Sequence, residues 1–162
     1  MSNLLEKKSV VRVKNYFKEI NENIDLIVLD ETARTAKDAA NSLNKKVGAI
    51  VKSLIFQNDI KSEYYLCLVS GDKLASLDKL SNIVGYKIVK ANAEECKKIT
   101  GFSIGGVSPF AQNTQPTRIF IDRCLNRFDM IYAAAGHPYV VFGITYGKLC
   151  KITKGEVVSI VQ

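Results

Sequence analysis

The most informative stretch of the chain is residues 48–70, which read GAIVKSLIFQNDIKSEYYLCLVS. Two mostly apolar runs, residues 50–56 and residues 64–69, lie on either side of the pair Asn58 and Asp59. β-Branched and aromatic residues favour strands, whereas Asn and Asp favour the turns between them. The stretch therefore predicts a β-hairpin of two buried strands.

The residues before the hairpin predict two helices and a strand. Residues 8–20 carry apolar side chains at helical spacing, and residues 26–29 form a short apolar run. Thr35 and Asp38 then form a helix-capping pattern, which predicts a helix through Leu43. The hairpin is thus preceded by both kinds of element.

The residues after the hairpin continue this irregular alternation. We expect helices over residues 77–84 and 93–100, ended by Gly85 and Gly101. Loops or turns separate the expected strands, which cover residues 87–89, 118–121, 130–134, 139–144 and 157–161. The pattern predicts an α+β fold with a mixed, largely antiparallel sheet flanked by helices, and it disfavours a doubly wound parallel sheet.

Length and composition indicate an ordinary globular protein. The chain has 162 residues, of which 47% are hydrophobic and 24% are charged. A chain of this length typically forms one domain, so we expect residues 1–162 to be a single domain. The composition excludes the disordered, fibrous and low-complexity classes.

The net charge is the one skewed quantity. The chain has 23 Lys and Arg against 16 Asp and Glu, a formal net charge of +7. The basic residues are spread along the chain, so a positive face can arise only through folding. The excess indicates either an anionic partner such as nucleic acid or a charge that maintains solubility, and the sequence leaves both readings open.

Cysteine and histidine usage bears on metals and on the redox compartment. The cysteines, Cys67, Cys96, Cys124 and Cys150, lie far apart, and His137 is the single histidine. Zinc and dithiol sites use closely spaced ligands, so we expect no metal and no cofactor. We find no secretory signal and no apolar run long enough for a membrane span. We therefore expect a cytoplasmic protein with reduced thiols and no membrane partner.

Lys52 is unusual because it lies inside an apolar strand. Alternation places it on one face with Ile50 and Leu54, and the opposite face, with Val51 and Ile55, is apolar too. Lysine is rarely buried without a partner, so the site needs a nearby anion, a cleft open to water or the negative charge of a ligand. The alternative is a lysine that protects the edge of a sheet from pairing.

The segment from Gly105 to Pro109 is the second candidate. Its two glycines allow close approach of the backbone, and a proline fixes the chain after them. Such a loop presents backbone N–H groups to a ligand. It is also typical of a plain connection, and it matches neither common phosphate-binding motif.

We find no pattern for a nucleophile activated by histidine. The single histidine, His137, lies in a Gly-His-Pro turn, and the sequence marks no serine or cysteine as its partner. The adjacent carboxylates of Asp30 and Glu31, and of Glu94 and Glu95, are typical of solvated ends of elements.

Five segments carry a resemblance to a known family. In order and spacing they resemble the YbaK/EbsC family of aminoacyl-tRNA editing domains, which also occur within bacterial prolyl-tRNA synthetases. The segments are ETARTAKDAANSL (31–43), GAIVKSLIF (48–56), LVSGDKLASLDKL (68–80), TGFSIGGVSPF (100–110) and IYAAAGHPYVVF (131–142). The resemblance covers residues 31 to 158.

The resemblance implies a curved or barrel-like sheet and a free-standing deacylase. Such a domain hydrolyses the ester that joins a wrong amino acid to the terminal adenosine of a tRNA, commonly tRNA-Pro. Mischarged tRNA and prolyl-tRNA synthetase would be its partners. The catalytic residue implied is Lys52, and the substrate-binding residues implied are Ser53, Gly105, Gly106, Val107, Ser108, Pro109, Gly136 and His137.

These residues suit ester hydrolysis without a protein nucleophile. The ammonium of Lys52 can hold a phosphate or a ribose, and glycine N–H groups can polarise the carbonyl as it becomes an oxyanion. Water, the vicinal hydroxyl or a thiol of the substrate would then attack the ester.

The chain departs from the family pattern at two places. Ala111 stands where the family often has glycine after the proline, so we expect a different far rim of the pocket. Members that act on cysteinyl-tRNA tend to carry an acidic residue after the position of His137, where this chain has Tyr139, Val140 and Val141. We therefore expect alanine or serine, rather than cysteine, as the residue removed.

Two other functions remain as alternatives. A non-catalytic module would bind aminoacyl-tRNA or a synthetase and leave the ester intact. A sensor would bind a free amino acid or nucleotide.

Overall fold

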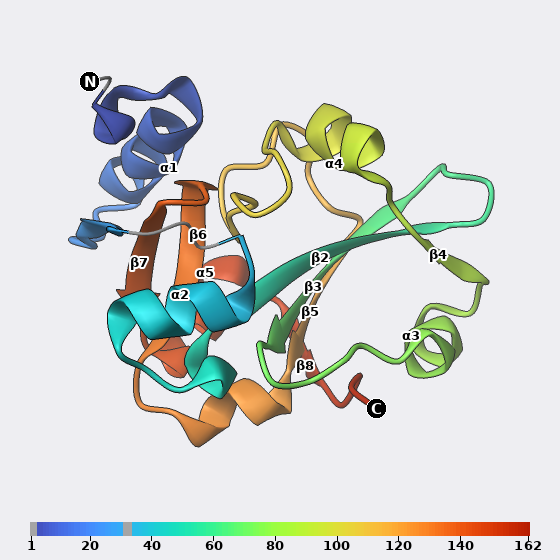
Figure 1. Ribbon diagram of the computed structural model, residues 1–162. Coiled ribbons are helices and arrows are strands. Elements are labelled where there is room, and N and C mark those ends of the chain that lie inside the picture. The colour runs from blue at the N-terminus through green and yellow to red at the C-terminus, as the bar shows by residue number, and fades with distance from the viewer. Residues whose placement is uncertain (1–2, 31–33) are drawn as a thin grey trace.

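The computed structural model describes residues 3–30 and 34–162, which form an α+β fold (Figure 1). Glu31, with which the resemblance begins, lies outside the described residues. The helices are α1 (Lys8–Glu19), α2 (Ala36–Leu43), α3 (Leu77–Val84), α4 (Ala93–Thr100) and α5 (Tyr146–Thr153). The strands are β1 (Leu26–Val28), β2 (Val51–Asn58), β3 (Tyr64–Ser70), β4 (Ile88–Lys90), β5 (Arg118–Asp122), β6 (Ile131–His137), β7 (Val140–Ile144) and β8 (Glu156–Val158).

The predicted hairpin is confirmed as β2 and β3, the centre of the larger sheet. The two strands pair antiparallel from Val51 opposite Ser70 to Gln57 opposite Tyr64. The side chain of Asn58 accepts from the backbone N–H groups that close the turn. Within the described residues this sheet has five strands in the order β4-β2-β3-β5-β8, and β5 and β8 join it in parallel.

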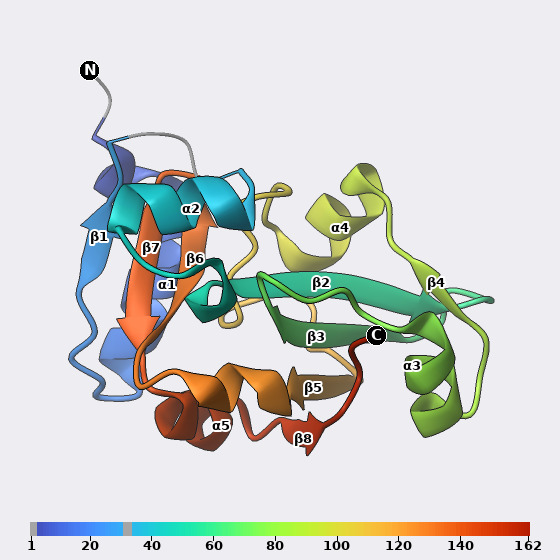
Figure 2. The ribbon, with the colours of Figure 1, turned by 60° about the horizontal axis from the view of Figure 1, so that its bottom comes forward.

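A smaller sheet contains β1, β7 and β6 in that order, all antiparallel. A single parallel bridge between Ile50 and Tyr132 connects it to the larger sheet. Helix α1 packs on one face, where Val13 and Phe17 meet Phe142 in one buried cluster. Helix α2 covers the opposite face (Figure 2). The mixed, largely antiparallel prediction is confirmed, with the strands divided between two sheets.

Strand β2 is buried on both faces, as its sequence indicates. Ile55 belongs to the cluster that includes α1, whereas Phe56 belongs to the cluster that includes Leu80 of α3. A strand in this position is stabilised by burial of apolar area on each side. Residues 52–54 are only partly buried, and pairing with β3 holds the segment that carries Lys52.

The structure differs from the prediction mainly near the C-terminus. Helix α5 occupies a segment that we expected to be a loop, and β8 covers only the beginning of the predicted strand 157–161. The Thr145 hydroxyl accepts from the N–H of Lys148 and begins α5, but Leu149 is the one fully buried residue of this helix. Tyr146 and Cys150 stand with Leu149 at helical spacing and pack, partly buried, against the core, so the segment carries a short helical period that the prediction missed.

Helix α3 and helix α4 end as predicted. Gly85 and Gly101 follow them with φ of +87° and +79°, in the left-handed region that favours glycine. Helices of the described residues are all too short or too polar to cross a membrane.

Candidate active site

The main cavity lies beside an unpaired edge of β2. Strand β4 pairs with β2 only at Phe56 and beyond, and the bridge to β6 is made at Ile50. Among the described strands, none pairs with the intervening edge, Val51–Leu54. Here a cavity of about 470 Å³ opens between α2, the two sheets and the loop after α4. Its size lies in the range of ligand-binding pockets.

Lys52 lines this cavity and is half-buried. Its ammonium donates a hydrogen bond to the backbone carbonyl of Lys73. Burial lowers the pKa of Lys52, the nearby carboxylate of Asp72 opposes this effect, and the positive charge of Lys90 adds to it. The ammonium therefore has one fixed partner in the protein and further N–H donors beside the cavity.

Positive charge surrounds the cavity. Arg34 and Lys37 reach it from the α2 side, and Lys52 and Lys90 reach it from the larger sheet. None of the described residues that line it is acidic. Four cationic groups around a mostly apolar space favour a ligand that carries both an anionic and an apolar part.

The glycine-rich segment forms one wall of the cavity, as the sequence suggested. We call residues 101–112 the pocket loop. Gly105 and Val107 line the cavity, and Gly105 has a φ of +90°, which favours glycine. Gly106 packs behind them, because a Cβ there would lie 2.9 Å from the backbone N of His137.

Ser108 and Pro109 lie behind this wall and not among the cavity residues. Ser108 is fully buried, its hydroxyl accepts from the N–H of Phe110 at 3.0 Å, and its carbonyl accepts from Gln112 at 2.6 Å. These bonds hold the pocket loop in shape.

Ser53 lines the cavity next to Lys52. Its buried hydroxyl has no hydrogen-bond partner among the described residues. The oxygen has almost no exposed surface, so a ligand could bond it only after the wall of the cavity moves. Ser42, Gln57 and Ser70 carry buried side-chain atoms of the same kind, so the unpartnered hydroxyl does not distinguish Ser53.

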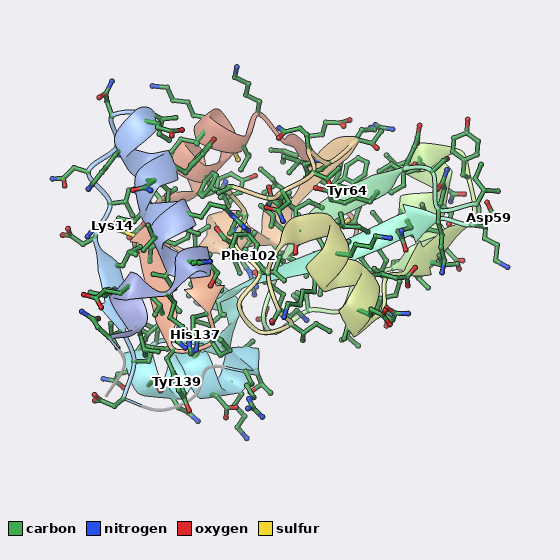
Figure 3. The ribbon with its side chains drawn as sticks, turned by 90° about the horizontal axis from the view of Figure 1, so that it is seen from above. Lys14, Asp59, Tyr64, Phe102, His137 and Tyr139 are labelled. Atoms are coloured by element: carbon green, nitrogen blue, oxygen red, sulfur yellow. The ribbon has the colours of Figure 1, made fainter. Side chains whose placement is uncertain are left out.

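Gly136 and His137 lie at the end of β6, outside the residues that line the cavity. Gly136 has a φ of +92°, and a Cβ there would lie 2.5 Å from the carbonyl oxygen of Ser9 in α1. The His137 Nδ1 accepts from the N–H of Tyr139 at 3.1 Å, and the two rings lie beside each other (Figure 3). Burial, and then the charge of Lys7, lower the pKa of His137.

Other cavity residues escaped the sequence analysis. Tyr132, Ala134 and Val141 come from the smaller sheet, Ala91 directly follows β4, and Cys96 lies in α4. Burial raises the pKa of Cys96, so its thiol is a neutral part of the wall. No local signal marks these residues, because they lie far apart in the chain. The sequence predicts a strand over residues 130–134 and carries the resemblance in IYAAAG, but it assigns Tyr132 and Ala134 no place in a site.

The described residues also contain no group of three or more His, Cys, Asp or Glu side chains that could hold a metal ion.

Comparison with known proteins relates this site to a family. The sequence model of the aminoacyl-tRNA editing domain matches residues 30–152. YwhH, an uncharacterized protein of Bacillus subtilis strain 168, is 26% identical over 149 residues, which are 92% of this chain and 94% of that protein. A proline–tRNA ligase of Caldicellulosiruptor saccharolyticus is 32% identical over 83 residues, which are 51% of this chain and 14% of the ligase.

Comparison with a solved structure also relates the chain to aminoacyl-tRNA editing. The crystal structure of a proposed trans-editing enzyme for prolyl-tRNA synthetase has a TM-score of 0.89 and 33% identity, over 96% of this chain and 98% of that chain. The family match covers most of the chain, and the structural match covers nearly all of both proteins. The chain therefore belongs to the family of aminoacyl-tRNA editing domains and is an aminoacyl-tRNA hydrolase.

Proposed function

We propose that the protein is a free-standing editing enzyme that removes a small wrong amino acid, alanine or serine, from tRNA-Pro. The observation that carries this proposal is the cavity, in which Lys52 and three further cations surround a mostly apolar space. An aminoacyl-tRNA end combines an anionic phosphate with a small acyl group. The two parts of the cavity fit these two parts of the substrate.

The reaction is hydrolysis of one ester bond. A water oxygen attacks the ester carbonyl carbon, the bond from that carbon to the ribose oxygen breaks, and the ribose oxygen takes a proton. The products are a free amino acid and a tRNA with an unmodified 3′ end. The substrate's own vicinal hydroxyl could orient this water or accept its proton, but it cannot replace the water, because its own attack would only move the acyl group to the neighbouring ribose oxygen.

Lys52 has the central role in this proposal. Its bond to the Lys73 carbonyl fixes the ammonium, and its remaining N–H donors are free to hold the terminal ribose or phosphate. Backbone N–H groups of the pocket loop, near Gly105 and Val107, would stabilise the oxyanion that forms on the attacked carbonyl. Ser53 lines the cavity next to Lys52 and would contact the substrate there.

Two comparisons support tRNA-Pro as the substrate. The segment similar to a proline–tRNA ligase and the structure similar to a proposed trans-editing enzyme both concern proline. One methylene is worth only about 1–3 kcal/mol in a pocket, so rejection of prolyl-tRNA should depend on the shape of the proline ring or on its secondary amine. We propose prolyl-tRNA synthetase, whose errors the enzyme would correct, as a partner, and the cytoplasm as the site of action.

The test is deacylation of tRNA-Pro charged with alanine, serine, cysteine or proline. We expect the alanyl and seryl forms to be hydrolysed, and we expect Lys52→Ala to lower the rate by about 100-fold or more. Lys14→Ala is the matched control, because Lys14 is exposed on α1 away from the cavity.

Two outcomes would contradict the proposal. If Lys52→Ala hydrolyses every substrate as fast as the native chain, the role of Lys52 is wrong. If the native chain binds mischarged tRNA and leaves all the esters intact, it acts only as a binding module.

A further inference from the structure

The pocket loop is closed at its base. The N–H of Asn113 donates to the carbonyl of Thr100 at 3.0 Å, which joins the two ends of residues 101–112. The loop carries Gly105 and Val107 in the wall of the cavity. The position of that wall therefore depends on what holds the ends of the loop.

Arg12 of α1 binds both ends. Its Nε donates to the carbonyl of Ala111 at 2.8 Å, and its Nη2 donates to the carbonyl of Thr100 at 3.0 Å. The guanidinium carbon lies 4.3 Å from the centre of the Phe102 ring, which lies between α1 and α4 (Figure 3). A planar guanidinium presents its donors in fixed directions, so the two bonds fix the two carbonyls relative to each other.

The chain leaves space for this guanidinium. A Cβ at Gly101 would lie 2.7 Å from the Arg12 Nη2 and 2.5 Å from the Asn113 Nδ2. A side chain at this position would therefore displace the guanidinium from the Thr100 carbonyl. The glycine that ends α4 also permits the contact.

The partners of Arg12 all belong to one segment. Among the described residues it makes none of the ion pairs; its contacts are two carbonyls and one ring of the pocket loop and its base. Burial lowers the pKa of Arg12, so the cation is partly removed from water. A desolvated cation directed at a single loop indicates a role in fixing that loop.

Apolar contacts hold the same loop less specifically. Phe110 stacks on Tyr16 with ring centres 5.5 Å apart and meets Phe17 edge-on at 5.4 Å. Such contacts keep the loop against α1 but do not set the distance between its ends. Loss of the Arg12 side chain should therefore loosen the loop without unfolding the protein.

We propose that Arg12 is a positioning residue for the cavity, which holds Gly105 and Val107 in place by binding the carbonyls at both ends of the pocket loop. Arg12 lies outside residues 30–152, the part matched by the family. The kinetic part of the proposal rests on the proposed function, whereas the order of the loop can be measured without it.

The first experiment measures amide hydrogen exchange in the native chain, Arg12→Ala, Arg12→Lys and the control Lys14→Ala. We expect the amides of residues 101–112 in Arg12→Ala to exchange about tenfold faster or more, while β2 and β3 keep their protection. An unchanged loop overturns the proposal. So does an equal loss of protection in β2 and β3, which would make Arg12 a general structural residue.

The second experiment measures single-turnover deacylation of alanyl-tRNA-Pro by the same variants. We expect Arg12→Ala to lower the maximal rate about tenfold and to leave the half-saturating concentration within about twofold, because the acyl group is misplaced while the cationic groups remain. Free guanidinium ion should restore part of the rate in Arg12→Ala and none in Lys14→Ala. Arg12→Lys, which keeps the charge but not the fork, should lie between.

The kinetic outcomes are decisive in both directions. A fully active Arg12→Ala overturns the proposal, and so does a loss that neither guanidinium nor Arg12→Lys reverses. If the native chain hydrolyses none of the substrates, the proposed function fails, and the exchange experiment still decides whether Arg12 orders the loop.

Discussion

Arg127 donates to both carboxylate oxygens of Asp72, with distances of 3.0 and 2.7 Å. Asp72 directly precedes Lys73, whose carbonyl accepts the hydrogen bond from Lys52. The pair therefore fixes, at one turn, both a negative charge and a carbonyl close to the candidate catalytic ammonium. Arg127 holds the pKa of Asp72 below its usual value, so this charge persists at neutral pH.

This arrangement predicts opposite pH effects for two variants. If the ammonium of Lys52 is required, activity falls as pH rises through its pKa, which burial holds below the ordinary lysine value. Asp72→Asn removes a charge that favours the ammonium, so the fall should move to lower pH. Lys90→Met removes a charge that disfavours it, so the fall should move to higher pH.

The measurement is the single-turnover rate against pH, after subtraction of spontaneous ester hydrolysis at each pH. The Asp72 and Arg127 side chains are 37% and 40% exposed, so loss of their pair should cost only about 0–1 kcal/mol of stability. Unfolding therefore does not confuse the comparison. Shifts of the same sign in both variants would contradict an electrostatic effect on Lys52.

The four cationic residues around the cavity, which we call the cationic rim, predict that tRNA binding depends on salt. If the acceptor end of tRNA crosses Arg34 and Lys37, the logarithm of the half-saturating concentration should rise linearly with the logarithm of salt concentration. Arg34→Gln and Lys37→Gln should each lower this slope by about one, and Lys14→Gln should leave it unchanged. A slope that the rim variants do not alter would place the tRNA elsewhere.

Neighbouring alanines in β6 predict separable effects on activity and stability. Ala134 lines the cavity, whereas Ala135 is fully buried in the core against α1. Ala134→Val should fill substrate space and lower kcat/KM about tenfold or more with little change in Tm. Ala135→Val should overpack the core and lower the stability by about 1–3 kcal/mol.

Thermal unfolding and deacylation of both variants test this pair. Equal losses of stability would mean that the side chain at position 134 does not point into free space. The two positions differ by one residue in a strand, which reverses the face that each side chain occupies.

Local patterns in the sequence predicted most of the fold. The hairpin, the helix that begins at Thr35 and the helices that end at Gly85 and Gly101 depend on neighbouring residues, and the structure confirms each of them. Helix α5 was missed because it has only eight residues, so the helical spacing of Tyr146, Leu149 and Cys150 covers a single turn. The division of the strands into two sheets was missed because pairing between distant strands leaves no local signal.

The candidate site likewise contains one residue that a local pattern marks and others that only folding brings together. Lys52 was visible because a charge inside an apolar strand is a local anomaly. The other cations of the rim, and Tyr132 and Val141 in the wall, meet only after folding. The Asp72 and Arg127 pair lies 55 residues apart in the chain, and no spacing rule connects them.

Ala111 provides a prediction about stability. Its φ is +64°, so the backbone takes a conformation that suits glycine. A left-handed conformation costs an L-residue about 1–2 kcal/mol. Glycine would remove this cost. It would also increase the conformational freedom of the unfolded chain, which offsets part of the gain in stability. We expect Ala111→Gly to raise the free energy of unfolding by about 0.5–1 kcal/mol.

Chemical denaturation measures this gain, and Ala40→Gly is the control. Ala40 lies buried inside α2, where glycine should lower the stability by about 1 kcal/mol or more. The same change of residue thus has opposite signs at the two positions. If Ala111→Gly also destabilises the protein, the methyl group of Ala111 contributes more through its packing against the core than its backbone conformation costs.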